Sequence, residues 1–319
     1  MKMTFPESIQ SAAIQIQSFI RKTPFVHSKA FSDITGAEVR FKLESIQVTG
    51  SFKARGAINK LLSLEDHEKQ QGVISASTGN HGAAVAYAAG QLGIKCTIYV
   101  PDDASPAKID NMKQFGAEIE FYGDDCIKAE AKAREISISK SRSYVSPYND
   151  PYVIAGQGTI GVEIESQCDG LDAVIISVGG GGLIGGTAGF LKSIWPHIHV
   201  IGCSPENSAV MIHSIKAGEI LEISSKPTLS DGTAGGVEGN SITFPICCDM
   251  IDETVLVTEK EIKDAMITYM DKEHQLLEGA AGTVVATLLK KKNDLIGKRV
   301  GLVICGGNIS LDTVRDLLN

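Results

Sequence analysis

The sequence predicts an α/β protein whose parallel sheets are flanked by helices. From residue 38 onward, short strand-like runs alternate with longer segments of helical periodicity. This alternation is typical of βαβ units with right-handed crossovers. At residues 77–82 and 179–182, a loop rich in glycine and small polar residues joins a strand to a helix. Such loops lie at the carboxyl ends of parallel strands, where open α/β sheets place their ligands.

The expected elements of the first half follow in chain order. Residues 6–20 carry apolar residues at helical spacing, and Thr23-Pro24 ends this helix, because a residue before proline avoids the helical region. Residues 38–43 alternate like a strand. Further strands are expected at residues 72–76, 96–100 and 118–122. Further helices are expected from the stretch 49–55 to Leu64, after the loop 77–82 to Leu92, and at residues 105–115 and 124–139.

The second half repeats the pattern. A helix is expected near residues 157–167. The uninterrupted apolar run at residues 173–178 indicates a strand that is buried on both faces. Further strands are expected at residues 198–203, 254–257 and 300–305, and further helices at residues 208–217, 259–270 and 280–290.

The length of 319 residues suits two domains of moderate size. We expect a small mobile domain at residues 72–148. Residues 1–65 and 149–319 are expected to form a large discontinuous domain, with the ligand in the cleft between the two. No regulatory domain is expected after Asn308, because the chain ends soon after it.

Composition excludes several classes of partner. The formal net charge is -8, which argues against a nucleic-acid partner. No apolar run reaches membrane-spanning length, and the N-terminus has no cationic region followed by a long apolar core. The seven cysteines form no C-x-x-C pair, which fits a reducing compartment. We therefore expect a cytoplasmic protein that binds a small molecule.

One lysine stands in an unusual setting, in the stretch Thr49-Gly50-Ser51-Phe52-Lys53. Lysine becomes a nucleophile toward carbonyl groups when burial or neighbouring groups lower its pKa. The aromatic ring of Phe52 beside it suits a flat partner. The alternative is an exposed lysine at the start of a helix that Thr49 or Ser51 caps. The other motifs of the chain decide between these two interpretations.

Four consecutive glycines, Gly179-Gly180-Gly181-Gly182, end a buried strand and begin a helix. Glycine lets backbone N–H groups approach an anion closely, and the helix N-terminus adds positive potential, so a phosphate is expected there. A tight turn without a ligand is the alternative, but four glycines exceed what a turn needs. The G-x-G-x-x-G spacing that ends at Gly185, with Glu206 about 20 residues further on, leaves a nicotinamide dehydrogenase as a rival. The loop has no following Gly-Lys-Ser/Thr, which excludes a P-loop nucleoside triphosphatase.

Two further strand ends carry small or polar residues. The backbone amides and hydroxyls of Ser77-Thr78-Gly79-Asn80-His81 can hold a carboxylate, or they can simply cap the next helix. Cys305-Gly306-Gly307-Asn308 ends the final strand. Its glycines allow a close approach, and a thiol can meet a weakly basic ring nitrogen without donating a full charge.

Taken in order, these motifs resemble those of the fold type II pyridoxal-phosphate enzymes, and among them the serine/threonine dehydratase and serine racemase family. Ala155-Gly156-Gln157-Gly158-Thr159 adds a further match. The resemblance covers nearly the whole chain and displaces the dehydrogenase interpretation. It implies a two-domain fold similar to the tryptophan synthase β subunit, and a homodimer.

The resemblance implies a role for each residue around the ring of the cofactor, pyridoxal 5'-phosphate. Lys53 is expected to carry the cofactor as a Schiff base. Phe52 is expected on one face of the ring and Gly236 on the other. Asn80 is expected to hydrogen-bond the ring hydroxyl, and Cys305, where many members have serine, to face the pyridine nitrogen.

The remaining roles concern the phosphate and the substrate. Gly179, Gly180, Gly181 and Gly182 are expected to cradle the cofactor phosphate. The substrate carboxylate is expected in the loop formed by Ser77, Thr78, Gly79, Asn80 and His81. Glu278 lies in an E-x-x-A-G-type region that the family places near the cofactor.

The activity that the resemblance implies is that of an ammonia-lyase, or dehydratase. It eliminates water from a β-hydroxy amino acid such as L-threonine or L-serine and yields a 2-oxo acid and ammonia. A serine or aspartate racemase with dehydratase side activity is one alternative. Another is a specialised dehydratase, because residues 231–238 and 76–82 are similar to enzymes of hydroxyectoine breakdown. A non-enzymatic cofactor-binding module is a different class, and the presence of Lys53 argues against it.

Two positions depart from the family patterns. Racemases of the family have serine at the position of Thr78, as the acid/base on the second face of the substrate, whereas many dehydratases have alanine. Thr78 keeps a hydroxyl, so racemisation stays open. Family members that bind a divalent cation use acidic residues where this chain has Ser204, Ser208 and Val210. Because hard cations prefer carboxylates, no activating metal is expected.

Overall fold

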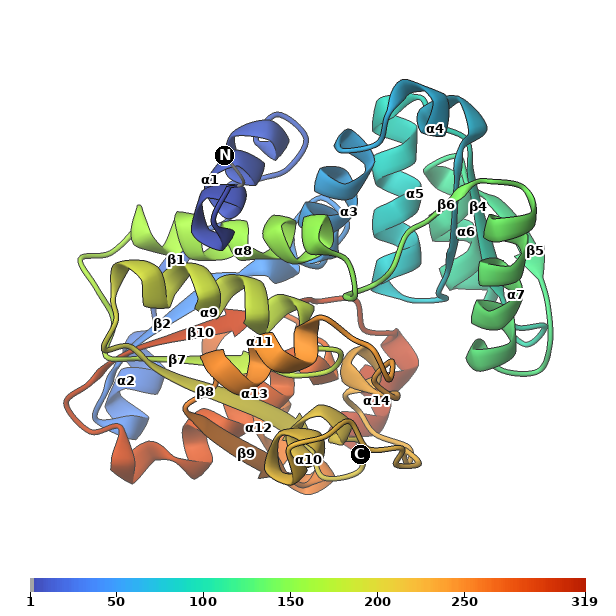
Figure 1. Cartoon of the computed structure of the whole chain (residues 1–319). Coiled ribbons are helices and arrows are strands. Elements are labelled where there is room, and N and C mark those ends of the chain that lie inside the picture. The colour runs from blue at the N-terminus through green and yellow to red at the C-terminus, as the bar shows by residue number, and fades with distance from the viewer. Residues whose placement is uncertain (1–2) are drawn as a thin grey trace.

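The computed structural model describes residues 3–319 and contains two parallel sheets (Figure 1). Within the larger sheet only the pairing of β1 with β2 is antiparallel. In spatial order, its strands are β1 (Phe25–His27), β2 (Glu38–Leu43), β10 (Arg299–Ile304), β7 (Ala173–Ser177), β8 (His199–Pro205) and β9 (Glu253–Val257). The smaller sheet is parallel throughout and contains β5 (Glu118–Phe121), β4 (Cys96–Val100), β3 (Val73–Ala76) and β6 (Ser143–Tyr144). The predicted α/β class with parallel sheets is confirmed.

Helices flank both sheets (Figure 1). Those around the larger sheet are α1 (Phe5–Ile16), α2 (Lys29–Thr35), α8 (Pro151–Glu165), α9 (Gly182–Ile194), α10 (Val210–Ala217), α11 (Thr243–Met250), α12 (Glu259–Glu273), α13 (Gly279–Lys290) and α14 (Leu311–Leu318). Those around the smaller sheet are α4 (Asp66–Gln71), α5 (Asn80–Leu92), α6 (Pro106–Gln114) and α7 (Cys126–Ser139). Among the helices of residues 3–319, none is long and apolar enough to cross a membrane.

Helix α3 (Lys53–Leu62) lies between the two sheets and contacts both α5 and α8. Its residues Ile58 and Leu61 are fully buried in the apolar core of the smaller sheet, together with Val85 and Ile98. The core of the larger sheet is separate. Because α3 begins at Lys53, the position of this lysine depends on how the helix is held.

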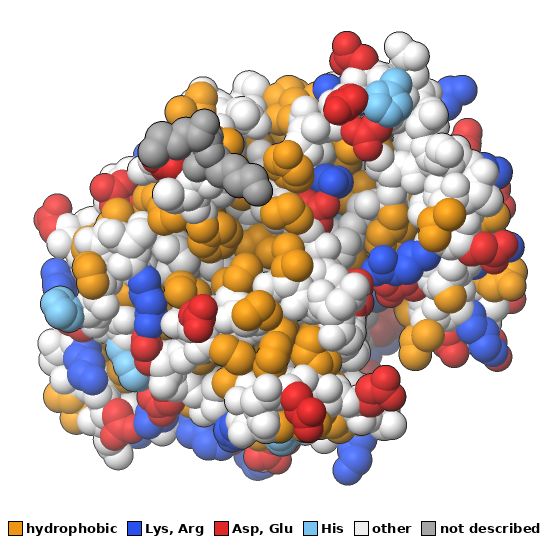
Figure 2. Space-filling view, in the orientation of Figure 1, with side chains coloured by type: hydrophobic (Ala, Val, Ile, Leu, Met, Phe, Trp, Pro, Cys, Tyr) orange, Lys and Arg blue, Asp and Glu red, His pale blue; other side chains and the backbone are white. Residues whose placement is uncertain are grey.

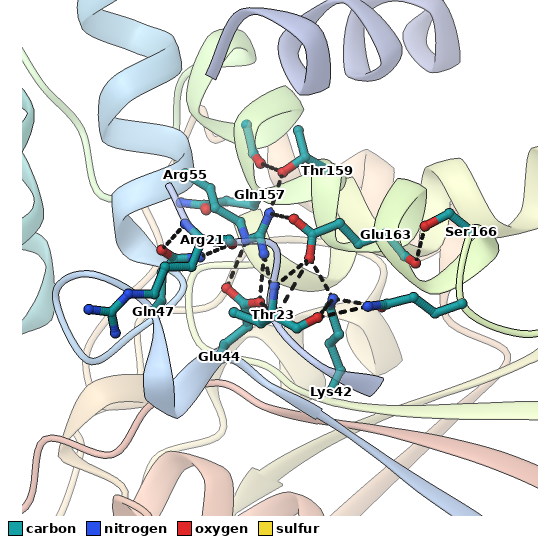
Figure 3. A network of polar contacts seen from close by, with 12 residues as sticks. Arg21, Thr23, Lys42, Glu44, Gln47, Arg55, Gln157, Thr159, Glu163 and Ser166 are labelled. Carbon is teal, nitrogen blue, oxygen red and sulfur yellow. Dashed lines mark hydrogen bonds and ion pairs between the residues drawn. The ribbon is translucent and has the colours of Figure 1, made fainter. Parts of the chain in front are cut away.

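A buried polar network fixes the first turn of α3 (Figure 3). The Arg55 guanidinium donates to both carboxylate oxygens of Glu44 at 2.7 Å and to Glu163 at 2.7 Å. The Glu163 carboxylate also accepts a 2.5 Å hydrogen bond from the buried Lys42 ammonium. The side chains of Arg55 and Glu44 are fully buried. The network therefore ties α3 to α8 and to the end of β2 through charge-assisted bonds.

Several boundaries differ from the sequence prediction. Helix α1 ends at Ile16 rather than residue 20. Helix α8 begins at Pro151, six residues before its predicted start. The Asp150 side chain caps it by accepting from the amides of Tyr152 and Val153, and proline is well suited to the first helical position. The sequence analysis did not predict the short elements β1, α2, α4, β6, α11 and α14.

Candidate active site

All of the predicted site residues line one cavity of about 810 Å³. The cavity lies where loops leave the carboxyl ends of β3, β7 and β10. The residues that the structure brings together are Phe52, Lys53, Ser77, Thr78, Gly79, Asn80, His81, Gly179, Gly180, Gly181, Gly182, Gly236, Glu278 and Cys305. Segments far apart in the sequence thus contribute to one site.

Lys53 is partly buried at the first position of α3. Its ammonium donates a 2.8 Å hydrogen bond to the Pro147 carbonyl and lies 5.1 Å from the centre of the Phe52 ring. Burial lowers the pKa of Lys53 to about 8, although the nearby Cys305 and Glu278 act in the opposite direction. A lowered pKa increases the fraction of free amine near neutral pH, so Lys53 can act as a nucleophile and as a base.

The glycine loop forms a cradle between β7 and α9. Gly181 has a φ of +86° and is the N-cap of α9, and no side chain caps the helix. A Cβ at Gly180 would collide with the Tyr148 ring, and a Cβ at Gly181 would lie 2.6 Å from the Cys247 sulfur. Backbone amides at an uncapped helix N-terminus are suited to binding an anion. Tyr148, which the sequence analysis did not select, forms one wall of this cradle.

A second helix N-terminus opens into the same cavity. Gly79 is the N-cap of α5 and has no side-chain capping bond, and its own N–H donates to the Ser77 hydroxyl at 3.1 Å. The buried His81 ring has Nε2 at 2.9 Å from the Val145 carbonyl. Burial, and then the charge of Lys53, lower the pKa of His81 to about 3. A neutral His81 thus anchors the loop, and the uncapped N-terminus of α5 faces the cavity, where it can bind a carboxylate.

The Asn80 side chain bonds to two other residues of the cavity, Glu278 and Asn308. Its side-chain amide donates to both carboxylate oxygens of Glu278, at 2.8 and 3.0 Å. Its carbonyl oxygen accepts from the Asn308 amide at 2.7 Å, and Asn308 also donates to the Thr49 carbonyl at 2.9 Å. Asn308 was part of a recognised motif but was not selected as a site residue. The Asn80 amide is therefore held by Glu278 in this structure, and its predicted bond to a ring hydroxyl stays a prediction.

Glu278 and Cys305 are both buried. Burial, reinforced by the charge of Asp231, raises the pKa of Glu278 to about 7, while the hydrogen bond from Asn80 lowers it. Burial, and then Glu278, raise the pKa of the Cys305 thiol, which accepts from the Ser177 hydroxyl at 3.6 Å. The thiol is therefore neutral. Gly236 lies on the exposed wall, where a Cβ would meet open space.

Ser204 and Ser208, two of the positions that the sequence analysis compared with a metal site of the family, are engaged in other contacts. The Ser204 hydroxyl donates to the Val178 carbonyl at 2.6 Å. The Ser208 hydroxyl lies 2.7 Å from that of Ser225 and accepts from the Gly235 amide. Across residues 3–319, no group of three or more His, Cys, Asp or Glu side chains is placed to hold a metal ion.

Known proteins resemble the chain over almost its full length. A family model described as pyridoxal-phosphate dependent enzyme matches residues 16–306. The chain is 39% identical over 313 residues to L-threonine ammonia-lyase of Thermotoga maritima, covering 98% of this chain and 78% of that protein. It is also 39% identical over 313 residues to the L-threonine dehydratase catabolic TdcB of Escherichia coli, covering 98% and 95%. The crystal structure of serine racemase from Dictyostelium discoideum matches with a TM-score of 0.89 at 36% identity, covering 96% of this chain and 99% of that one.

Proposed function

Because the chain belongs to the family of pyridoxal-phosphate-dependent enzymes, we propose that it is an ammonia-lyase acting on β-hydroxy amino acids. Its substrates are of the L-threonine or L-serine type, and its products are a 2-oxo acid and ammonia. One observation carries the proposal: the Lys53 amine, with its lowered pKa, lies in the same cavity as the glycine loop and a neutral Cys305 thiol.

The cavity fits pyridoxal 5'-phosphate chemically. Lys53 supplies an amine for the aldehyde, and Gly179–Gly182 supply amides for the phosphate, in a cradle that a side chain at Gly180 or Gly181 would fill. Cys305 would supply a neutral thiol for the ring nitrogen, Asn80 would supply an amide for the ring hydroxyl, and Phe52 and Gly236 would flank the ring. When bound, the cofactor supplies an electron sink for charge that develops at the substrate Cα.

The residues of this chain then perform distinct tasks. The N-terminus of α5, with Ser77 and Thr78, binds the substrate carboxylate and orients Cα. Lys53 removes the Cα proton from one face, and the Pro147 carbonyl holds the amine in place. Because a neutral Cys305 thiol would donate no full charge to the ring nitrogen, charge at Cα would be stabilised less. This favours departure of the β-hydroxyl over return of the proton.

A substrate panel tests the proposed reaction. L-threonine, L-serine, D-serine, threo-3-hydroxyaspartate and hydroxyectoine are each supplied to the purified protein, and 2-oxo acid, ammonia and inversion at Cα are followed. We expect L-threonine or L-serine to give 2-oxo acid and ammonia in equal amounts. Inversion of serine without 2-oxo acid would favour the racemase instead, and 2-oxo acid from hydroxyectoine alone would favour the specialised dehydratase.

Racemisation is the second candidate, because Thr78 brings a hydroxyl to the cavity and the chain is 36% identical to a serine racemase. Elimination needs one base, whereas inversion needs a second acid/base on the opposite face of Cα. The β-branch of threonine restricts χ1, so its hydroxyl reaches Cα less readily than that of serine. We expect elimination to dominate, Thr78→Ala to retain most of it, and Thr78→Ser to increase racemisation.

Proton NMR in deuterated water, with each enantiomer of serine, separates the two reactions. Deuterium at Cα of the opposite enantiomer reports inversion, and 2-oxo acid reports elimination. Fast conversion of L-serine to D-serine by the natural chain, with loss of that conversion in Thr78→Ala, would reverse the order of the two activities.

We further propose how the parts of the chain move and associate. Residues 72–148 form the small domain, which closes over the substrate against the large domain of residues 1–65 and 149–319. The Arg134–Glu238 ion pair, at 3.0 Å, bridges the two.

Hydrophobic side chains gather over α1, α8, α9 and α11 (Figure 2), and the exposed Ile14, Tyr152 and Ile242 belong to these helices or adjoin them. This face is the proposed homodimer contact of a cytoplasmic enzyme.

A further inference from the structure

A buried hydroxyl supports the glycine loop from the side that faces away from the cavity. Thr243 is the first residue of α11 and is fully buried. Its hydroxyl donates a 2.6 Å hydrogen bond to the Gly180 carbonyl. The Ser241 hydroxyl lies 2.7 Å from the Thr243 hydroxyl and accepts from the Thr243 N–H at 3.3 Å. The Gly180 carbonyl thus accepts the last bond of a short chain that runs through the Ser241 and Thr243 hydroxyls. Hydrogen bonds in such a chain polarise and strengthen one another.

This contact determines the direction of the next N–H group. In a trans planar peptide, the carbonyl of one residue and the N–H of the following residue point in opposite directions. Gly180 and Gly181 line the cavity, whereas Thr243 and Ser241 do not. When Thr243 holds the Gly180 carbonyl away from the cavity, the Gly181 N–H points toward it.

A run of four glycines does not fix this direction by itself. Glycine adopts positive and negative φ about equally readily, and Gly181 has a φ of +86°. If the peptide turned over, the Gly180 carbonyl oxygen would face the cavity and repel an anion there. We propose that Thr243 is a positioning residue that orients the Gly180–Gly181 peptide toward the cofactor phosphate. This inference rests on the proposed role of the glycine loop as the phosphate site.

The neighbouring cysteine contributes less to this orientation. The Cys247 sulfur lies one turn further along α11, at 3.8 Å from the Gly181 carbonyl. That carbonyl already accepts the 2.9 Å bond from the Gly185 N–H within α9. A thiol is a weak donor, so its removal leaves the Gly181 carbonyl satisfied. The orienting effect is therefore assigned to the Thr243 hydroxyl.

Cofactor binding to the full chain tests the proposal. The cofactor is removed from the purified protein, and the Kd of pyridoxal 5'-phosphate and of pyridoxal is measured for each variant by absorbance or fluorescence titration. Thr243→Val is expected to raise the Kd of pyridoxal 5'-phosphate about tenfold, as for the loss of one charge-assisted hydrogen bond. The Kd of pyridoxal, which has no phosphate, is expected to stay unchanged. The ³¹P resonance of the bound phosphate is expected to shift in the same variant.

Two control variants separate orientation from general damage. Thr243→Ser keeps the hydroxyl and is expected to bind pyridoxal 5'-phosphate like the natural chain. Thr287→Val removes another fully buried threonine hydroxyl, which donates to the Thr283 carbonyl on α13, and is expected to leave both affinities unchanged. If Thr243→Val does not fold, Ser241→Ala provides the test, with an expected increase of about threefold in the Kd of pyridoxal 5'-phosphate from a weakened second bond.

Each outcome has a distinct meaning. Equal affinity of Thr243→Val and the natural chain for pyridoxal 5'-phosphate would overturn the role of Thr243 and leave the phosphate site in place. An equal loss of affinity for pyridoxal and its phosphate would also overturn it, because a structural defect acts on both. Binding of the two ligands with equal affinity by the natural chain would instead contradict the phosphate site itself, on which the inference rests.

Discussion

Lys53→Ala is expected to remove the visible absorption of the bound cofactor and to lower 2-oxo acid formation by about 10³-fold or more, since the same amine serves as covalent anchor and general base. The amine lies 2.8 Å from the Pro147 carbonyl and carries a pKa of about 8. Lys108, which also lines the cavity, instead lies 3.6 Å from the Asp231 carboxylate. Absorption spectra and initial rates, measured with added pyridoxal 5'-phosphate, give the result directly.

The matched control is Lys60→Ala, on the same helix. Lys60 pairs with Asp150 at 2.7 Å and does not line the cavity, so its removal is expected to leave the absorption band in place. Borohydride reduces the Schiff base and so attaches the cofactor permanently to its lysine. Digestion of the reduced natural protein then identifies the peptide that carries the cofactor as a label. A label on any lysine other than Lys53 would contradict the assignment.

Arg55→Ala is expected to lower the free energy of unfolding by about 3–5 kcal/mol, because removal of one partner leaves buried charges unpaired. The guanidinium satisfies both oxygens of Glu44 and one oxygen of Glu163, and alanine supplies no donor. Glu163 keeps the Lys42 ammonium, whereas Glu44 keeps only the Thr23 hydroxyl, which donates to it at 2.5 Å. Urea unfolding followed by circular dichroism measures the change.

Arg315→Ala is the control for the loss of an arginine from an ion pair. Arg315 pairs with Asp312 at 3.0 Å, and the two side chains are 70% and 83% exposed. Exposed pairs contribute little, so a loss below about 1 kcal/mol is expected. A loss of that small size in Arg55→Ala would show that the buried network does not stabilise the fold.

The sequence predicted which loops lie together better than it predicted the bounds of the elements around them. The carboxyl ends of parallel strands meet at one edge of a sheet, so the loops after residues 177 and 304, which follow β7 and β10 of the larger sheet, could be expected to converge, whereas the loop after residue 76 reaches the cavity from β3 of the smaller sheet. The structure places all of them on one cavity. The family resemblance was confirmed as well, by a match over residues 16–306.

What the sequence could not predict depends on contacts between distant residues. Arg55 and Glu163 are separated by 108 positions, and Thr243 and Gly180 by 63. No local sequence pattern predicts that the members of either pair are in contact, because each residue by itself is typical of an ordinary helix or turn. The early start of α8 is different: the sequence Asp150-Pro151 is a recognised helix start, and the signal was present but not used.

The two uncapped helix N-termini make the cavity an electrostatic junction. Helix α5 extends from the smaller sheet and α9 from the larger one, and each directs the positive end of its dipole into the same space. Without an anion between them, these like partial charges oppose the approach of one part of the chain to the other. A ligand that carries both a phosphate and a carboxylate neutralises both ends at once. If residues 72–148 close over the substrate as proposed, occupancy of the cavity would be coupled to that closure, because the negative charge of the ligand would lie between the N-termini of α5 and α9.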